Sequence, residues 1–246
     1  MAEVTSNQKP ATSMGTHLRH EEQHLKSSDL LTDIVIGMSD GLTVPFALAA
    51  GLSGAVSSTG IIVIAGIAEI CAGSIAMGLG GYLAGKTEQD HYKTELQREF
   101  YEVDNLRDRE VAETKEFFAN IGLSEELQEQ ATLEIAKDKK QWVDFMMKYE
   151  LGLDKPDPRR ATKSALNIGI SYIIGGLVPL SPYFFVTQPV NGLKISVMVT
   201  LLCLFIFGWL KSKVTGVNAW GGALRVTLIG AVAAAAAFGV AKFFEP

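Results

Sequence analysis

The sequence is poor in cysteine: Cys71 and Cys203 are the only two, and both fall within apolar stretches. In such places we expect small buried side chains rather than a disulfide, and two cysteines make no zinc-type cluster. No Asn-x-Ser/Thr acceptor occurs, and the polar residues before position 31 predict no cleavable signal peptide. Basic residues are not in excess, and the net charge of −5 argues against nucleic acid as a partner.

Charged residues are also sparse in five long apolar windows. A window of ~20 mostly apolar residues is enough to cross a bilayer as a helix. We therefore predict an all-α, polytopic membrane protein with five transmembrane helices, and no enzyme activity. The predicted spans cover approximately residues 31–52, 61–85, 162–180, 190–210 and 219–243. They divide the chain into a polar N-terminal segment (1–30), a two-span hairpin (31–85), a helical insert (86–160) and the last three spans (161–246).

The first span contains the stretch IVIGMSDGLTVPFALAAGL, in which Asp40 is the one ionisable residue. A carboxylate inside a membrane costs ~2.5–3.5 kcal/mol or more, so it commonly marks an ion or proton path. Pro45 has no N–H, which leaves the carbonyl of Gly41 without its helical donor, next to Asp40. These oxygens are candidate ligands for a cation. The alternative is a proline-kinked helix with a neutral, hydrogen-bonded Asp40.

The second span carries one acid, Glu69, on a ridge of small residues that also holds Met77. Residues four apart lie on one face of a helix, and small faces allow close helix contacts in lipid. Taken alone, Met77 is typical of packing filler. Its place on the ridge of Glu69 favours a role as a soft ligand beside the carboxylate in a transport pathway.

The insert 86–160 is highly charged, with 19 acidic and 13 basic residues. Its apolar spacing predicts three helices: one continuing from the second span to Asp104, one around Val111–Phe118, and one from Ser124 to about Leu151. Basic residues favour a cytosolic N-terminus and a cytosolic insert, which puts the C-terminus on the lumenal side.

Glutamates in this insert occur in pairs three residues apart, Glu99 with Glu102 and Glu110 with Glu113. Such pairs also occur on ordinary solvated helix faces. Here they are accompanied by thioethers and a further acid in the third helix: Met146, Met147 and Glu150. Carboxylates attract a divalent cation, and sulfur favours transition metals over Mg²⁺ and Ca²⁺. We therefore predict an exchangeable metal site.

The motifs DGLTVPFALAAGL, Met77-Gly-x-Gly-Gly-Tyr and the paired E-x-x-E segments resemble those of plant vacuolar iron transporters, the VIT family. The resemblance covers nearly the whole chain. It implies a dimeric Fe²⁺/H⁺ exchanger in the vacuolar membrane, with a cytosolic metal-binding domain between spans 2 and 3. It also implies transport roles for Asp40, Glu69 and Met77. It further implies that the acids and methionines of the insert are cytosolic ligands: Glu99, Glu102, Glu110, Glu113, Met146, Met147 and Glu150. Arg107-Asp108 departs from relatives with proline between the Glu pairs.

The sequence leaves several alternatives open. A membrane-anchored iron sensor or buffer needs only the acids of the insert, whereas a transporter also needs Asp40 and Glu69. A channel is disfavoured, although no sequence feature separates exchange from leak. Fe²⁺, Mn²⁺, Co²⁺ and Zn²⁺ all fit mixed carboxylate and thioether ligands. The number of bound ions, and whether two subunits share one, are also undetermined.

Overall fold

The computed structural model describes residues 29–244, so the predicted N-terminal segment lies almost entirely outside the described part. Within residues 29–244 the chain is helical, with no strand. The helices in order are α1 (Asp29–Ala55), α2 (Thr59–Asn105), α3 (Arg107–Asn120), α4 (Glu125–Ile135), α5 (Lys139–Tyr149), α6 (Arg160–Leu180), the 3₁₀ helix η1 (Ser181–Phe184), α7 (Pro189–Val214) and α8 (Ala219–Phe244).

Five of these helices are long and apolar enough to cross a membrane, namely α1, α2, α6 with η1, α7 and α8. They coincide with the five predicted windows and extend a few residues beyond most of them. Helix α1 continues through Pro45, and α6 continues through Pro179. The prediction of an all-helical chain with five candidate spans is therefore confirmed.

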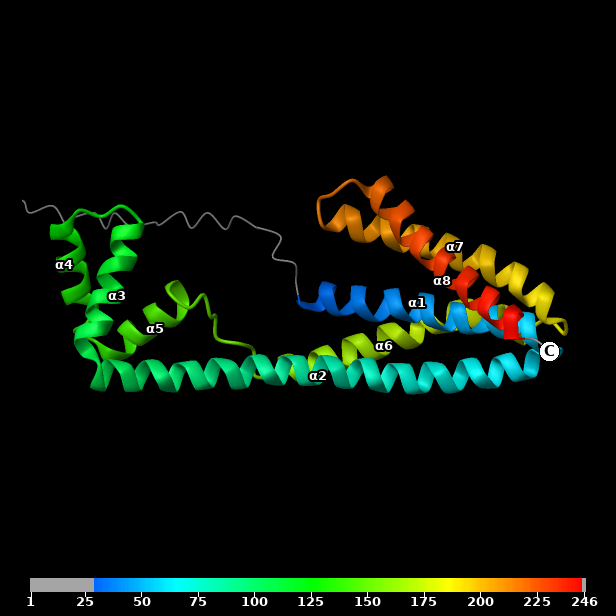
Figure 1. Cartoon of the computed structure of the whole chain (residues 1–246), viewed down its shortest axis with the longest axis horizontal. Coiled ribbons are helices and arrows are strands. Elements are labelled where there is room, and N and C mark those ends of the chain that lie inside the picture. The colour runs from blue at the N-terminus through cyan, green and yellow to red at the C-terminus, as the bar shows by residue number, and fades with distance from the viewer. Residues whose placement is uncertain (1–28, 245–246) are drawn as a thin grey trace, which may run out of the picture.

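Helix α2 forms the long axis of the molecule (Figure 1). Its 47 residues reach roughly 70 Å at 1.5 Å per residue, more than twice the hydrocarbon thickness of a bilayer. The first half lies beside α1 and α6, and the second half extends to the group formed by α3, α4 and α5 (Figure 1). The charged insert is thus attached directly to a membrane-type helix.

Helices α1 and α6 pack closely because glycines line their contact. A Cβ built on Gly41 would lie 2.4 Å from the carbonyl oxygen of Tyr172, and one on Gly37 would lie 2.3 Å from that of Ile168. A Cβ on Gly175 of α6 would lie 2.9 Å from the backbone nitrogen of Leu42. Side chains larger than hydrogen would therefore force α1, which carries Asp40, away from α6.

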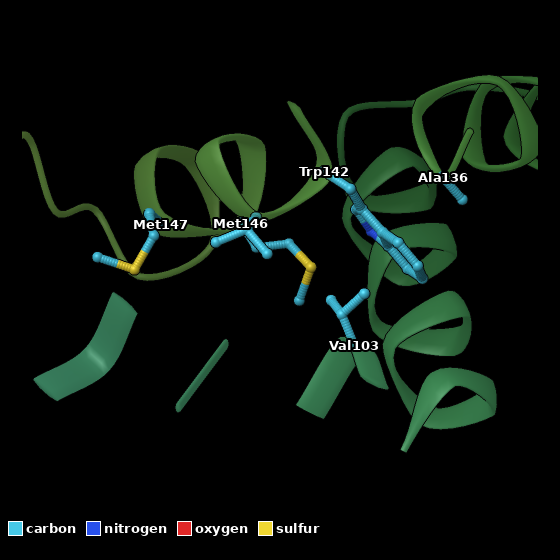
Figure 2. Packing of buried hydrophobic residues seen from close by; sticks show 6 residues of the cluster. Val103, Ala136, Trp142, Met146 and Met147 are labelled. Atoms are coloured by element: carbon cyan, nitrogen blue, oxygen red, sulfur yellow. The ribbon is translucent and has the colours of Figure 1, made fainter. Parts of the chain in front are cut away.

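A separate apolar core holds α5 against the end of α2 (Figure 2). Its buried residues include Val103, Trp142, Met146 and Met147. The Trp142 indole donates a 2.8 Å hydrogen bond to Thr114 Oγ1, which ties α5 to α3. The apolar packing and this buried hydrogen bond fix the relative positions of α2, α3 and α5.

The predicted third helix of the insert, from Ser124 to about Leu151, is in fact two helices, α4 and α5. The break has a local cause: Asp138 adopts extended backbone angles and its carboxylate accepts from the backbone N–H groups of Lys140 and Gln141. That arrangement is an N-cap, which begins a new helix. Ser124 occupies the N-cap position of α4.

Candidate metal and transport sites

Three predicted glutamates meet where α2 ends and α3 begins. Leu106 interrupts the helix with φ −127° and ψ 34°, and the chain turns so that Glu110 of α3 faces Glu99 and Glu102 of α2. One carboxylate oxygen from each of the three lies within 4.8 Å of the others. A transition metal lies roughly 2.0–2.2 Å from carboxylate oxygens, so a small rotation of the side chains would let one ion bind all three.

Two of these carboxyl groups are buried and carry oxygens without a hydrogen-bond partner. Glu99 is 2% exposed and Glu110 is fully buried. Within residues 29–244, Glu99 Oε2 and both oxygens of Glu110 have no hydrogen-bond partner. A buried carboxylate without a partner is strongly unfavourable unless it is protonated or binds a cation. The cluster is therefore suited to bind either protons or a metal.

The electrostatics of the cluster point the same way. Burial raises the pKa of Glu99 from 4.5 to about 7, and the neighbouring charges of Glu150 and Glu102 add to the rise. Burial also raises the pKa of Glu110 to about 7, with Glu113 and Glu99 contributing. Near neutral pH both groups exchange protons readily, so a divalent cation would displace protons when it binds.

Glu113 and Glu150 belong to the same electrostatic group. Burial raises the pKa of Glu150, and the charges of Glu113 and Glu102 raise it further. Arg109 Nε lies 2.8 Å from Glu113 Oε1, which partly neutralises the exposed side of the cluster. The five predicted glutamates therefore lie near one another, although three of them form the compact group.

Met146 and Met147 face the apolar core rather than solvent. Each is 1% exposed, and Figure 2 shows the Met146 side chain directed toward Val103. Their burial is explained by packing alone, so their predicted role as metal ligands stays a prediction. They nevertheless belong to α5, the helix that is followed directly by Glu150.

The membrane-type helices contain a second acidic site, at Glu69. The hydroxyl of Tyr172 on α6 donates a hydrogen bond to Glu69 Oε1. The other oxygen, Glu69 Oε2, is buried without a partner among the described residues. A Cβ on Gly73, one turn along α2, would lie 2.4 Å from the Tyr172 hydroxyl. The missing side chain of Gly73 is what lets Tyr172 reach Glu69.

Asp40 and Met77 are both half-buried, on α1 and α2 respectively. Within the described residues, no hydrogen bond joins Asp40 to Glu69. Tyr172 of α6 lies between the two acids in another way. Its backbone lies against Gly41, the neighbour of Asp40, and its hydroxyl donates to Glu69. Met77 lies two turns beyond Glu69 on the same helix. Among the described residues, Asp40 and Glu69 thus lie near the same residue of α6, Tyr172, but the three predicted pathway residues form no closed site.

Comparison of the sequence with known proteins identifies the family of this chain. The model of the VIT family matches residues 31–242. The chain belongs to the VIT family. It is 51% identical to "Vacuolar iron transporter 1" of Tulipa gesneriana, over 91% of this chain and 90% of that protein. It is 50% identical to the protein of the same name from Eucalyptus grandis, with the same two coverages. "Protein CCC1" of Saccharomyces cerevisiae is 40% identical over 85% of this chain and 67% of its own length.

Sequence reasoning about this VIT-family chain missed two features. One is Tyr172, which reads as an ordinary aromatic residue of an apolar span until its contact with Glu69 is seen. The other is Asp33 near the start of α1, which is 1% exposed. Its carboxylate accepts from Arg160 at 2.9 and 3.2 Å and from Ser164 at 2.9 Å. The signal available in sequence was an acid at the very edge of a span and an arginine at the edge of another.

Proposed function

We propose that this chain is a proton-coupled transporter of divalent metal that carries Fe²⁺ from the cytosol across the vacuolar membrane. The relatives named vacuolar iron transporters support the substrate and the membrane. The observation that carries the proposal is Glu69, a carboxylate in an apolar helix with one buried oxygen left unpartnered. Such a group is costly to retain, and it commonly belongs to an ion or proton path.

In this mechanism Asp40 and Glu69 each hold either a proton or a share of the cation. From the cytosol, Fe²⁺ displaces the protons and binds the two carboxylates, with the Met77 thioether as a softer ligand. In an acidic lumen, protonation of the carboxylates releases the metal. Tyr172 donates to Glu69 Oε1 and so holds that carboxylate in place while its other oxygen stays available.

We assign residues 86–160 to the cytosol as a metal-binding domain, which puts the C-terminus in the lumen. The Glu99, Glu102 and Glu110 carboxylates would bind Fe²⁺ there and supply it to the membrane path. Glu113, Glu150, Met146 and Met147 complete the proposed set of ligands. Mn²⁺, Co²⁺ and Zn²⁺ suit the same oxygen and sulfur donors.

The proposed active form is a homodimer with α1 at its axis. A cavity of about 620 Å³ opens between α1 and α8, lined by apolar side chains and by Glu69. A second copy over this face would cover Val44, which is 44% exposed, and shield Glu69 from lipid. Cross-linking of a single cysteine at Val44 tests the axis, with a cysteine at exposed Leu166 on α6 as control. Cross-links at Leu166 but not at Val44 would place the axis elsewhere.

The alternative function is a membrane-anchored iron sensor or buffer that binds metal without moving it. A sensor or buffer would use the glutamates of α2 and α3. It would leave Glu69, inside an apolar helix, without a role. Uptake of Fe²⁺ into sealed vesicles containing the purified full chain separates the two. A transporter accumulates metal inside, and faster when the lumen is acidic. A sensor or buffer leaves the vesicle interior free of metal while still binding it outside.

A further inference from the structure

A cationic pocket lies where α7 turns into α8. Its volume is about 340 Å³, within the lower part of the range of roughly 300–1,000 Å³ that is usual for small-molecule sites. This turn lies at the same end of the bundle as the start of α1 (Figure 1). Its lining includes Lys211, Ser212, Asn218, Gly222 and Arg225.

Close packing of the two helices brings the cations of the pocket together. A Cβ on Gly222 of α8 would lie 1.7 Å from Ser212 Oγ, and one on Gly208 of α7 would lie 2.9 Å from Ala223 Cα. With glycine at both positions the backbones approach one another. Lys211 from the end of α7 and Arg225 from the second turn of α8 therefore line one cavity rather than two separate surfaces.

Among the residues that the structure describes, no carboxylate lines this positively charged pocket. None of its lining residues is acidic, and no Asp or Glu occurs anywhere from residue 158 to residue 244. Within residues 29–244, the ion pairs of the structure involve other cations, such as Arg160 with Asp33. Two cations that share a cavity without a carboxylate repel each other, and a bound anion would relieve that repulsion.

Neutral groups add donors to the same pocket. Asn218 Oδ1 accepts from the backbone N–H groups of Trp220 and Gly221, so Asn218 caps α8 and its amide is held at the pocket wall. Ser212, which is 4% exposed, also lines the pocket, and its hydroxyl lies against Gly222. The first turn of α8 also contributes the positive end of its helix dipole.

The surroundings of the pocket are those of a membrane surface. Trp220 is 70% exposed and packs against Phe205, with ring centroids 5.9 Å apart. Lys213 Nζ lies 4.8 Å from the ring centroid of Trp209. Tryptophan and lysine at the end of an apolar helix are typical of the lipid headgroup region. An anion at this depth is most directly supplied by a lipid headgroup.

We propose that the Lys211–Arg225 pocket binds the phosphate group of an anionic membrane lipid. Basic pockets between transmembrane helices bind such headgroups, and arginine and lysine both pair with phosphate oxygens. The lipid would bridge α7 and α8 at their glycine-lined crossing. This site is independent of the metal sites and would exist whether or not the protein transports iron.

The test measures thermal stabilisation of the purified full chain in detergent by dioctanoyl phosphatidic acid, with dioctanoyl phosphatidylcholine as the neutral lipid. The variant is Lys211→Gln with Arg225→Gln. The matched control is Lys213→Gln, which removes a cation from the same helix end outside the pocket. We expect phosphatidic acid to stabilise the parent and the control, and its affinity for the double variant to fall by about tenfold for each cation removed.

Each other outcome counts against the proposal. Equal stabilisation of the parent and the double variant, or a larger loss in Lys213→Gln, would overturn it, as would no stabilisation of the parent. Inorganic phosphate forms a second arm. If it stabilises the parent as strongly as the lipid does, with the same dependence on the two cations, the source is soluble phosphate and the lipid assignment is wrong. Should the double variant be unstable in phosphatidylcholine, Arg225→Gln alone, at an exposed position, replaces it.

Discussion

Replacing Glu110 by glutamine should stabilise the metal-free protein while weakening its metal site. Glu110→Gln keeps the shape of the side chain but removes a charge that is buried without a partner. In most sites, loss of a ligand is expected to destabilise or to be neutral. Here Glu110→Gln should raise the stability of the metal-free protein and lower that of the metal-bound protein, because the cluster buries the carboxylate without a partner.

The size of the effect follows from the pKa of Glu110, which rises from 4.5 to about 7 on folding. At 1.36 kcal/mol per unit, ionising this group in the folded protein costs about 3 kcal/mol, less where Glu99 is protonated in compensation. Below pH 4.5 the group is protonated in both states and contributes no difference. Between pH 4.5 and 7 the folded state holds the extra proton, so stability falls as pH rises, and above pH 7 the cost is complete. Relative to the parent, Glu110→Gln should therefore gain stability progressively from pH 4.5 to 7 and keep the full gain above pH 7.

Hydrogen exchange of backbone amides in α3 and α5 of the full chain measures this local stability, at pH-corrected rates from pH 5 to 8. Glu116→Gln is the matched control, since Glu116 is exposed on the same helix. Addition of Fe²⁺, or of Zn²⁺ as a redox-stable substitute, should protect the parent more than Glu110→Gln. If Glu110→Gln is less protected than the parent at pH 8 without metal, the account of an unpartnered buried carboxylate is wrong.

Three further predictions concern the membrane helices. Tyr172→Phe removes the donor to Glu69 and should slow metal uptake by roughly tenfold or more without loss of the folded protein, measured in vesicles; unchanged uptake would leave Tyr172 without a transport role. Met77→Ala should slow uptake of Fe²⁺ more than that of Mn²⁺, because the softer ion gains more from sulfur; equal slowing of both ions would favour simple packing. Asp33→Asn should lower the free energy of unfolding by up to about 3 kcal/mol, since it leaves Arg160 without its buried partner. Denaturant titration checks it against Asp29→Asn, whose carboxylate is exposed.

The helical spans were predictable because hydrophobic length alone determines them, as α7 and α8 illustrate. The break between α4 and α5 was not, because the apolar spacing continues across it and only the Asp138 cap separates the two helices. Local hydrogen bonds of one side chain decided that boundary. Periodicity averages over a window and does not detect such an event.

The acidic cluster was predictable in composition but not in shape. Spacing paired Glu99 with Glu102, whereas the contact with Glu110 depends on the turn at Leu106. The Tyr172–Glu69 contact could not be predicted from the sequence at all. It joins residues 103 positions apart through a gap that Gly73 leaves, and no local pattern encodes such a pairing.

Proton movement that accompanies metal uptake is the direct test of proton-coupled transport by this chain. Vesicles containing the full chain and an enclosed pH-sensitive dye would receive Fe²⁺ from outside, with the lumen initially acidic. Exchange of protons for Fe²⁺ should make the lumen more alkaline as metal enters. Asp40→Asn should abolish both signals, while binding at the glutamate cluster of α2 and α3 persists. Metal entry without alkalinisation, or coupled exchange at the parental rate in Asp40→Asn, would contradict it.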